Sequence, residues 1–272
     1  MAEQRAFNVL GNIAIVNFPN GYKISERKKF AEGILNQNKA ITTVLEKSGK
    51  FSGRLRKMKT KYIAGEKTKE VLYHENGCVF RFNIDDTYFS PRLSNERKEI
   101  ASKIKKNQEV LVMFAGVAPY SIVIAKNSQA KKVYSNEVNR KANKYAEMNI
   151  ALNKVKDKVE LLLGDIKKVA GTAQCTPNCG VRGQKLKNKF DVIVMPRPQL
   201  KEMFLKEAFR LSKKGTMIYY YDFCKVDEID SIVEKVKDEA KKSRRKIKIL
   251  NIKRAGEIAP YKYRIRIDFR II

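Results

Sequence analysis

The chain contains very few of the residues that bind transition metals. Among its 272 residues there is one histidine, His74, and there are four cysteines. Cys175 and Cys179 lie close together in the segment CTPNCG, but His74 lies about a hundred residues before them. Because a zinc site usually takes four Cys or His ligands, we expect no metal. A disulfide between Cys175 and Cys179, or two free thiols, is the interpretation that we prefer to zinc.

Long apolar segments are also absent. No apolar run approaches the ~20 residues that a membrane helix needs, and the first residues, MAEQRAFNVLG, lack a signal-peptide pattern. There is no internal repeat and no long low-complexity linker. With 43% hydrophobic residues, the chain is long enough for one large or two ordinary domains, each with its own core. We expect a soluble, cytoplasmic protein with no membrane contact.

Acidic residues are too few to balance the basic ones. Lys and Arg number 58 against 29 Asp and Glu, so the formal net charge is +29. Such an excess repels itself unless a polyanion shares its field, which favours RNA or DNA as the partner. The lysine-rich composition of a thermophilic source, or lysines on solvated helices, would explain part of the excess. An anionic membrane surface is disfavoured, because no amphipathic anchor helix is present.

The stretch VLVMFAGVAPYSIVIAK, residues 110–126, combines a short apolar run with a glycine and a proline. Residues 110–114 predict a parallel strand covered on both faces. Ala115-Gly116 predicts a tight turn, and Pro119 suits the first turn of a helix. This combination is typical of the nucleotide-cofactor site of a doubly wound sheet. Only one glycine of the usual cluster is present, so an ordinary βα turn is the alternative.

Strands and helices alternate from residue 100 onward, which predicts an α/β fold with a mainly parallel sheet. The expected strands are 110–114, 132–137, 159–163, 190–195 and 216–221, the expected helices are 139–152, 200–211 and 226–240, and strands 247–252 and 263–272 form an edge hairpin. Residues 1–90 predict a small α/β domain, with a strand at 8–16, a helix capped by Ser25, a strand at 42–45 and a hairpin at Glu75-Asn76-Gly77. Residues 91–272 form the second domain, which begins with a helix capped by Ser94.

Acidic residues follow two of these expected strands. Glu137 comes 21 residues after Gly116, and Asp165 follows the next strand. Ligands of an open parallel sheet bind beyond the carboxyl ends of its strands, where the first acid is placed to bind ribose hydroxyls. Asp165 is placed to reach an adenine edge. Because no phosphate-binding lysine follows the glycine turn, the pattern argues against an ATPase and suits S-adenosylmethionine.

Two motifs carry a resemblance to a known family. YFSPRLSNER, residues 88–97, and MFAGVAPY, residues 113–120, resemble segments of the archaeal and eukaryotic tRNA (guanine-37 N1)-methyltransferases. Matches at IAGE, ENG, YYY and APY extend the resemblance over almost the whole chain. It implies a class I S-adenosylmethionine-dependent methyltransferase fold (Rossmann-like) preceded by a small α/β RNA-handling domain. It also implies action on the anticodon stem-loop of tRNA, at position 37; we expect a monomer.

The sequence departs from the family pattern in four places. Val112 replaces an acid that contacts the methionine part of the cofactor, and Ala118 replaces the second glycine of a GVGP turn. Pro196-Arg197-Pro198 stands where the family has Asn-Leu-Pro or Asn-Pro-Pro. The similarity already starts near Asn8, so the separate N-terminal domain of many members is not expected. The missing asparagine resembles one archaeal branch, whose members methylate guanosine at N1, or 4-demethylwyosine at carbon 7, or both.

The resemblance, together with the chemistry, suggests three residues that act on the base. Glu96 would remove the N1 proton of guanosine; a helix-capping acid is the alternative reading of this residue. Arg56, with Arg54 as the fallback, would be the cation near O6 that stabilises the developing charge. A phosphate contact or a solvated strand face is the alternative for either arginine. Tyr88 would stack on the target base, which must leave the loop stack, or else it is a core aromatic at the domain boundary.

Other residues are expected to shape the site. Pro196 and Pro198 would form the base pocket, and Arg97 and Arg197 would contact the substrate, although Arg97 would equally well extend the basic surface. The residues expected to bind the cofactor are Phe114, Ala115, Gly116, Val117, Pro119, Glu137 and Asp165.

Two other functions fit the same residues. The first is transfer of the aminocarboxypropyl group of the same cofactor to the wyosine precursor, because the altered Val112 region touches the methionine part. The second is a non-catalytic RNA-binding protein with a degenerate cofactor site, which Val112 and Ala118 would explain.

Overall fold

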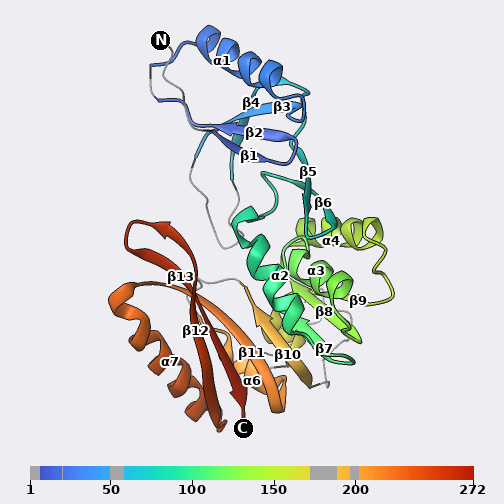
Figure 1. Ribbon diagram of the computed structural model, residues 1–272, viewed down its shortest axis with the longest axis vertical. Helices are drawn as coiled ribbons and strands as arrows, with labels where there is room; N and C mark the ends of the chain where they lie inside the picture. Colours follow the sequence, from blue (N-terminus) through green and yellow to red (C-terminus); the bar gives the residue numbers. More distant parts are fainter. Residues whose placement is uncertain (1–6, 20, 50–57, 172–188, 197–201) are drawn as a thin grey trace. The chain divides into compact units, whose positions relative to one another are not determined.

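The computed structural model describes residues 7–19, 21–49, 58–171, 189–196 and 202–272. The chain divides into two compact units, Met1–Pro91 and Arg92–Ile272. Figure 1 shows the elements of each unit. Among the described residues, no helix is both long and apolar enough to cross a membrane.

The described residues of the first unit form a four-stranded sheet in the order β1-β2-β3-β4, one helix and a separate hairpin. Its elements are β1 (Asn8–Leu10), β2 (Ile13–Val16), α1 (Ile24–Gln37), β3 (Thr43–Lys47), β4 (Thr60–Gly65), β5 (Glu70–Glu75) and β6 (Cys78–Asn83). The strand expected at 8–16 is in fact two antiparallel strands. They turn at Gly11, which has a φ of +58° and where a Cβ would lie 1.9 Å from the carbonyl oxygen of Leu72. The hairpin predicted at Glu75-Asn76-Gly77 is confirmed.

The second unit is built on a seven-stranded sheet in the order β12-β13-β11-β10-β7-β8-β9. Its strands are β7 (Glu109–Val112), β8 (Lys132–Glu137), β9 (Val159–Leu163), β10 (Phe190–Met195), β11 (Ser212–Lys225), β12 (Ile247–Ala259) and β13 (Lys262–Ile271). Strands β11, β10, β7, β8 and β9 run parallel, and β13 and β12 extend the sheet as an antiparallel edge hairpin. The mainly parallel α/β sheet that the sequence predicts is confirmed. The strand order reverses between β7 and β10, where such sheets bind ligands.

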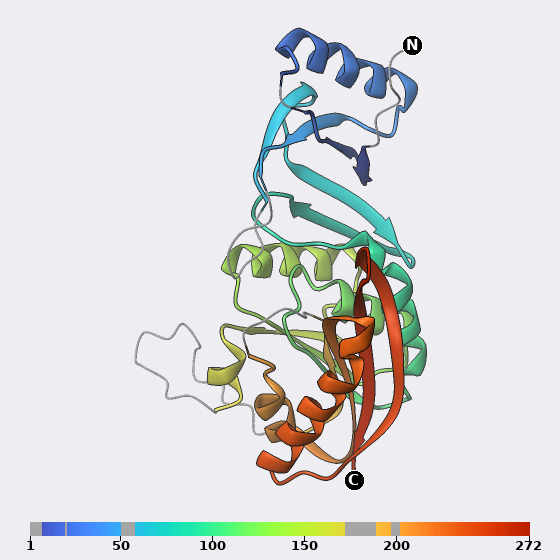
Figure 2. The ribbon, with the colours of Figure 1, turned by 90° about the vertical axis from the view of Figure 1, so that its left-hand side faces the viewer.

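Helices cover both faces of this sheet. They are α2 (Ser94–Lys103), α3 (Pro119–Asn127), α4 (Arg140–Leu152), α5 (Ile166–Val169), α6 (Leu205–Arg210) and α7 (Ile229–Lys242), with 3-10 turns at Pro91–Leu93 and Val226–Glu228. Strand β13 alternates strictly: Ile265, Ile267 and Phe269 pack into one core with α6 and α7, whereas Arg266 and Asp268 point to the opposite face. Figure 2 shows α7 (orange) and α2 (green) on opposite sides of these strands. A charged strand face therefore lies beneath α2.

Several element ends differ from the sequence expectation. The N-cap position of α1 is Lys23 rather than Ser25. That of α2 is Leu93 rather than Ser94, because a 3-10 turn leads directly into this helix. Helix α6 begins only at Leu205, since Phe204 has a φ of +57° that ends helical backbone. The apolar face expected for the helix at 139–152, which includes Ile150, does not extend to Leu152. That residue is 51% exposed, because it lies two positions after Ile150 and so points about 200° around the helix.

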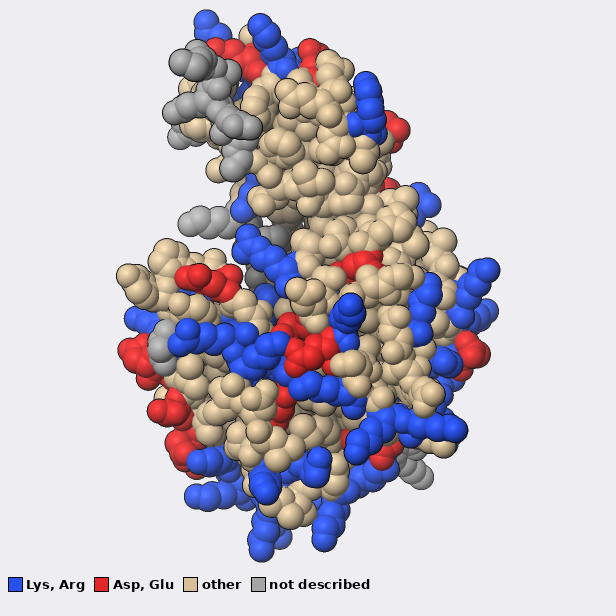
Figure 3. Space-filling model, viewed as in Figure 1, with Lys and Arg blue, Asp and Glu red and all other residues tan. Residues whose placement is uncertain are grey.

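Basic side chains are spread over the surface. On the face shown in Figure 3, Lys and Arg appear on both units, with smaller acidic groups between them. This distribution agrees with the formal net charge of +29 and supplies the field that attracts a polyanion.

Candidate active site

The candidate site begins at the turn between β7 and α3. Phe114, Gly116 and Ala118 all have left-handed backbone, with φ values of 58°, 59° and 66°. Only glycine adopts this conformation without a steric cost. The amide of Ala115 donates to the carbonyl oxygen of Asn136 at 2.8 Å, which ties the turn to the end of β8. The left-handed φ of Ala118 explains why a glycine is expected at that position.

Glu137 joins the end of β8 to the glycine turn. Its Oε2 accepts a hydrogen bond from the amide of Gly116 at 2.8 Å, and its Oε1 accepts one from the amide of Asn139 at 2.7 Å. Each carboxylate oxygen has two lone pairs, so each can accept one more donor. The buried carboxylate therefore shapes the turn and also keeps acceptor capacity for hydroxyl groups of a ligand.

Asp165 lies at the neighbouring strand end. The amide of Gly164 donates to the carbonyl oxygen of Glu137 at 2.9 Å, which brings the ends of β8 and β9 together. Asp165 caps α5, where its Oδ1 accepts from the amide of Lys167 at 3.0 Å. Two carboxylates and a turn without a side chain at Gly116 therefore meet beyond the carboxyl ends of parallel strands. This donor and acceptor set fits an adenosine-type cofactor with ribose hydroxyls.

A second group of polar residues forms a row across three strands. In the register of the sheet, Tyr221 on β11 lies opposite Arg266 on β13, and Arg266 lies opposite Lys253 on β12. Residues directly opposite each other project on the same face of a sheet. The row therefore presents a hydroxyl, a guanidinium and an ammonium group to the helix above it.

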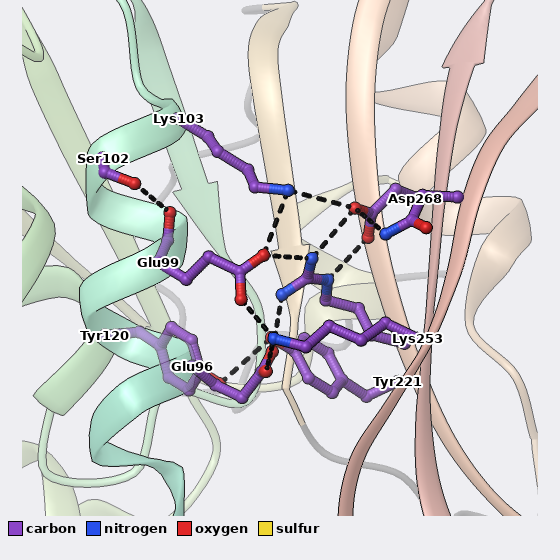
Figure 4. Close-up of polar contacts among 10 residues, drawn as sticks. Glu96, Glu99, Ser102, Lys103, Tyr120, Tyr221, Lys253 and Asp268 are labelled. Atoms are coloured by element: carbon purple, nitrogen blue, oxygen red, sulfur yellow. Dashed lines mark hydrogen bonds and ion pairs between the residues drawn. The ribbon is translucent and has the colours of Figure 1, made fainter.

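Helix α2 supplies the acids that meet this row, as Figure 4 shows. The carboxylate of Glu96 accepts from the Tyr221 hydroxyl at 2.9 Å, from Arg266 Nη1 at 2.6 Å and from Lys253 Nζ at 2.8 Å. Glu99, one turn further along α2, accepts from Arg266 Nη2 at 2.7 Å and also from Lys253. The N-terminal half of α2 is thereby fixed to the antiparallel extension of the sheet.

The cluster is electrically balanced. Asp268 accepts from Arg266 Nε at 2.7 Å, and Lys103 Nζ lies 3.1 Å from Glu99 and 3.6 Å from Asp268. Three carboxylates thus face three cations, and Arg266 at the centre is fully buried. Hydrogen bonds from Arg266 and then Lys253, opposed by burial, lower the pKa of Glu99 to about 2. Its hydrogen bonds to Glu96 and Glu99 raise the pKa of Lys253, so both groups are ionised at neutral pH.

Two tyrosine hydroxyls connect Glu96 to the segment that follows the glycine turn between β7 and α3, which we call the cofactor turn. The hydroxyl of Tyr120, in the first turn of α3, lies 3.3 Å from that of Tyr221, which donates to Glu96. Burial raises the pKa of Tyr120 to about 12 and that of Tyr221 well above its ordinary value. Both hydroxyls therefore keep their protons at neutral pH, and a hydrogen-bonded connection runs from the first turn of α3 to the acid on α2.

Comparison with known proteins identifies the family. The sequence profile of the TRM5/TYW2 methyltransferase domain matches residues 71–250, and that of the TYW2 N-terminal domain matches residues 2–68. The chain belongs to the TRM5/TYW2 methyltransferase family. The family expected from the sequence motifs is confirmed, and with it the class I S-adenosylmethionine-dependent methyltransferase fold.

Three relatives illustrate the similarity of this TRM5/TYW2 family member to others. The tRNA (guanine(37)-N(1))-methyltransferase Trm5b of Pyrococcus abyssi is 33% identical over 98% of this chain and 74% of its own length. Its crystal structure matches with a TM-score of 0.81 at 32% identity and the same coverage. The tRNA (guanine(37)-N(1))/4-demethylwyosine(37)-methyltransferase Taw22 of Nanoarchaeum equitans is 34% identical over 98% of this chain and 100% of its own. A complex of aTrm5 with tRNALeu matches with a TM-score of 0.79 at 26% identity, over 98% of this chain and 72% of that one.

The other predicted site residues of this family member lie in different settings. Arg97 is 1% exposed, with its guanidinium carbon 5.8 Å from the centre of the Tyr120 ring, so it does not extend the basic surface. Pro196 directly follows β10 and is partly buried. Tyr88 belongs to the first unit and is half-buried beside Phe89, which stacks on Phe82 at 4.7 Å. Arg54, Arg56, Arg197, Pro198, Cys175 and Cys179 lie outside the described residues.

Sequence reasoning missed the partners of Glu96. Glu96 does lie in the first turn of α2, where the helix dipole favours an acid, and its carboxylate also accepts from Tyr221, Arg266 and Lys253. The alternation in RIRIDFR, residues 264–270, was a signal, because it places every charged residue on one strand face. The charged face of a hairpin at the edge of a sheet is expected to face solvent, whereas here α2 covers that face of β13. Within the part of the chain that the structure describes, no group of three or more His, Cys, Asp or Glu could hold a metal ion.

Proposed function

We propose that this TRM5/TYW2 family member transfers the methyl group of S-adenosylmethionine to N1 of guanosine 37 in tRNA, and to carbon 7 of 4-demethylwyosine at the same position of tRNA-Phe. One observation carries the proposal: a buried, oriented carboxylate, Glu96, is joined through Tyr221 and Tyr120 to the turn that fits the cofactor. Relatives named for the N1 reaction alone and for both reactions support the two parts of the proposal.

The cofactor, when bound, supplies an electrophilic methyl group. Gly116 would let it approach the backbone, Glu137 would accept hydrogen bonds from its ribose hydroxyls, and Asp165 would reach its adenine edge. Phe114, Ala115, Val117 and Pro119 form the walls of the turn. The Glu137 carboxylate already holds Gly116 and Asn139 in place, so these groups are arranged before the ligand arrives.

Glu96 acts as the general base for the N1 reaction. Guanosine N1 carries a proton at neutral pH, so its lone pair becomes a good nucleophile only as that proton leaves. Glu96 would take the proton as N1 bonds to the methyl group that the cofactor would supply, and the cofactor's sulfur would keep the electron pair of the carbon–sulfur bond that is broken. Carbon 7 of 4-demethylwyosine does not require removal of an N1 proton, so Glu96 matters less for that product.

The substrate residues complete the proposal. Tyr88 stacks on the base after it leaves the anticodon loop, and Pro196 and Pro198 shape its pocket. Arg56 is a candidate cation for O6, and Arg197 contacts the substrate. Arg97 is buried against the Tyr120 ring, so its part is to support the site from behind. The excess of basic residues binds the phosphates of the anticodon stem-loop. The protein is expected to act as a monomer.

Transfer of a radioactive methyl label tests the proposal. The protein is incubated with methyl-tritiated cofactor and tRNA that carries guanosine 37, with an adenosine-37 tRNA as the control. We expect label in the guanosine-37 tRNA only. Aminocarboxypropyl transfer breaks a different carbon–sulfur bond and leaves the label on the by-product. A non-catalytic RNA-binding protein would label neither tRNA and would show no heat of cofactor binding in calorimetry.

A further inference from the structure

Lys253 is the solvent-facing member of the group around Glu96. Its side chain is 39% exposed, whereas that of Glu96 is 6% exposed. The other two donors to Glu96, Tyr221 and Arg266, are buried. A base that enters from solvent and reaches the Glu96 carboxylate therefore meets the Lys253 ammonium group next to it.

The two oxygens of Glu96 differ in how fully they are used. Oε2 accepts from both Tyr221 and Arg266, which engages both of its lone pairs. Among the described residues, Oε1 accepts only from Lys253 Nζ, at 2.8 Å. The acceptor position that remains for a substrate proton therefore lies on Oε1, directly beside a cation.

Lys253 also retains a hydrogen atom to donate. An ammonium group has three N–H donors, and here two of them are directed to Glu96 and Glu99. The two carboxylates keep this lysine protonated, as the raised pKa indicates. One N–H of Lys253 is therefore available to an acceptor that lies beside the proton donor on Oε1.

The exposed edge of guanine has the matching pattern. Its N1–H donor lies next to the O6 acceptor, and negative charge develops on O6 as the N1 proton leaves. A donor placed at that oxygen stabilises the transition state more than the ground state. We propose that Lys253 donates a hydrogen bond to O6 of guanine 37 while Glu96 Oε1 takes the N1 proton, an assignment that rests on the proposed function. Arg266 and Tyr221 hold the other carboxylate oxygen and so orient the pair.

The experiment combines a change in the protein with a change in O6. Single-turnover methyl transfer is measured for wild type and Lys253→Met, on tRNA with guanosine 37 and on tRNA with 6-thioguanosine 37, whose sulfur is a weak hydrogen-bond acceptor. We expect Lys253→Met to slow methylation of guanosine by roughly 10- to 100-fold, below the largest effects of oxyanion donors because Lys253 is partly exposed. The oxygen-to-sulfur ratio is the methylation rate on guanosine-37 tRNA divided by the rate on 6-thioguanosine-37 tRNA. We expect this ratio to fall at least about tenfold from wild type to Lys253→Met, because the variant lacks the N–H donor that favours oxygen over sulfur.

Lys103→Met is the matched control. Lys103 is 36% exposed and bridges Glu99 and Asp268 in the same cluster, but no contact with Glu96 is present among the described residues. We expect its oxygen-to-sulfur ratio to equal that of wild type. Lys253→Arg keeps a cation and is expected to retain most of the ratio, and thermal unfolding verifies that each variant is folded.

The possible results separate the inference from the proposed function. Arg56→Met is measured in the same way, because Arg56 is the other candidate cation for O6. An unchanged oxygen-to-sulfur ratio in Lys253→Met would overturn the assignment of Lys253, as would a ratio that falls only in Arg56→Met. Wild-type protein that leaves guanosine 37 unmethylated would instead refute the proposed function, and with it the premise of the inference.

Discussion

Replacing Arg266 by methionine removes the central cation of the cluster under α2. Its guanidinium contacts Glu96, Glu99 and Asp268 at 2.6 to 2.7 Å and is fully buried. Breaking a buried ion pair from one side costs about 3 to 5 kcal/mol, because an uncompensated buried charge remains. For a unit of this length, such a loss in the free energy of unfolding lowers Tm by on the order of 10 °C.

The free energy of unfolding that is lost in Arg266→Met depends on pH in a defined direction. The folded-state pKa of Glu99 is lowered from 4.5 to about 2, which corresponds to at most about 3 kcal/mol of stabilisation. A lowered pKa stabilises the fold above pH 4.5, and the stabilisation is lost as pH falls towards 2. Arg266 is the largest cause of the shift, so the difference between wild type and Arg266→Met is full near pH 7 and decreases between pH 4.5 and 2.

Urea unfolding across this pH range measures the effect. The control is Arg270→Met, because Arg270 lies on the same strand face but is exposed; its replacement is expected to change the free energy of unfolding by less than about 0.5 kcal/mol. A loss below about 1 kcal/mol in Arg266→Met at pH 7 would refute the reasoning. So would a loss of constant size from pH 7 to pH 2.5.

Two further predictions concern the two acids of the site. Glu137→Ala removes two charge-assisted hydrogen bonds to the turn together with those to the two ribose hydroxyls. At ~1.5 kcal/mol for each ribose bond, we expect the affinity for the cofactor, measured by calorimetry, to fall about 100-fold. Unchanged affinity would contradict the ribose assignment. Glu96→Ala is expected to slow N1 methylation of guanosine more than carbon-7 methylation of 4-demethylwyosine in single-turnover assays, and equal slowing would mean that Glu96 only holds α2 in place.

Local signals were sufficient to predict the parallel core of the sheet. The strands expected at 132–137, 159–163 and 190–195 have the same bounds in β8, β9 and β10. Short apolar runs that end in an acid, a glycine or a proline have few other conformations available. The start of α6 was not predictable in the same way, because it depends on the left-handed backbone of Phe204, a residue type that rarely adopts it.

The cofactor turn and the group around Glu96 also differed in how far local sequence signals could predict them. The glycine turn and Glu137 are 21 residues apart, within one strand–helix–strand unit whose geometry is well known. The partners of Glu96 are 125 to 170 residues away, and their contact depends on how α2 packs across three strands. Periodicity reveals the charged face of β13 but not the helix that covers it, so Arg266 and Lys253 emerged only from the structure.

Mass analysis of tRNA nucleosides provides the decisive measurement. The protein is incubated with S-adenosylmethionine and, separately, with tRNA that carries guanosine 37 or 4-demethylwyosine 37, and the digested nucleosides are analysed. We expect a single added methyl group on each base, at N1 of guanosine and at carbon 7 of 4-demethylwyosine. An added aminocarboxypropyl group, or unmodified bases in both tRNAs, would contradict the assignment of this family member as a tRNA methyltransferase of position 37.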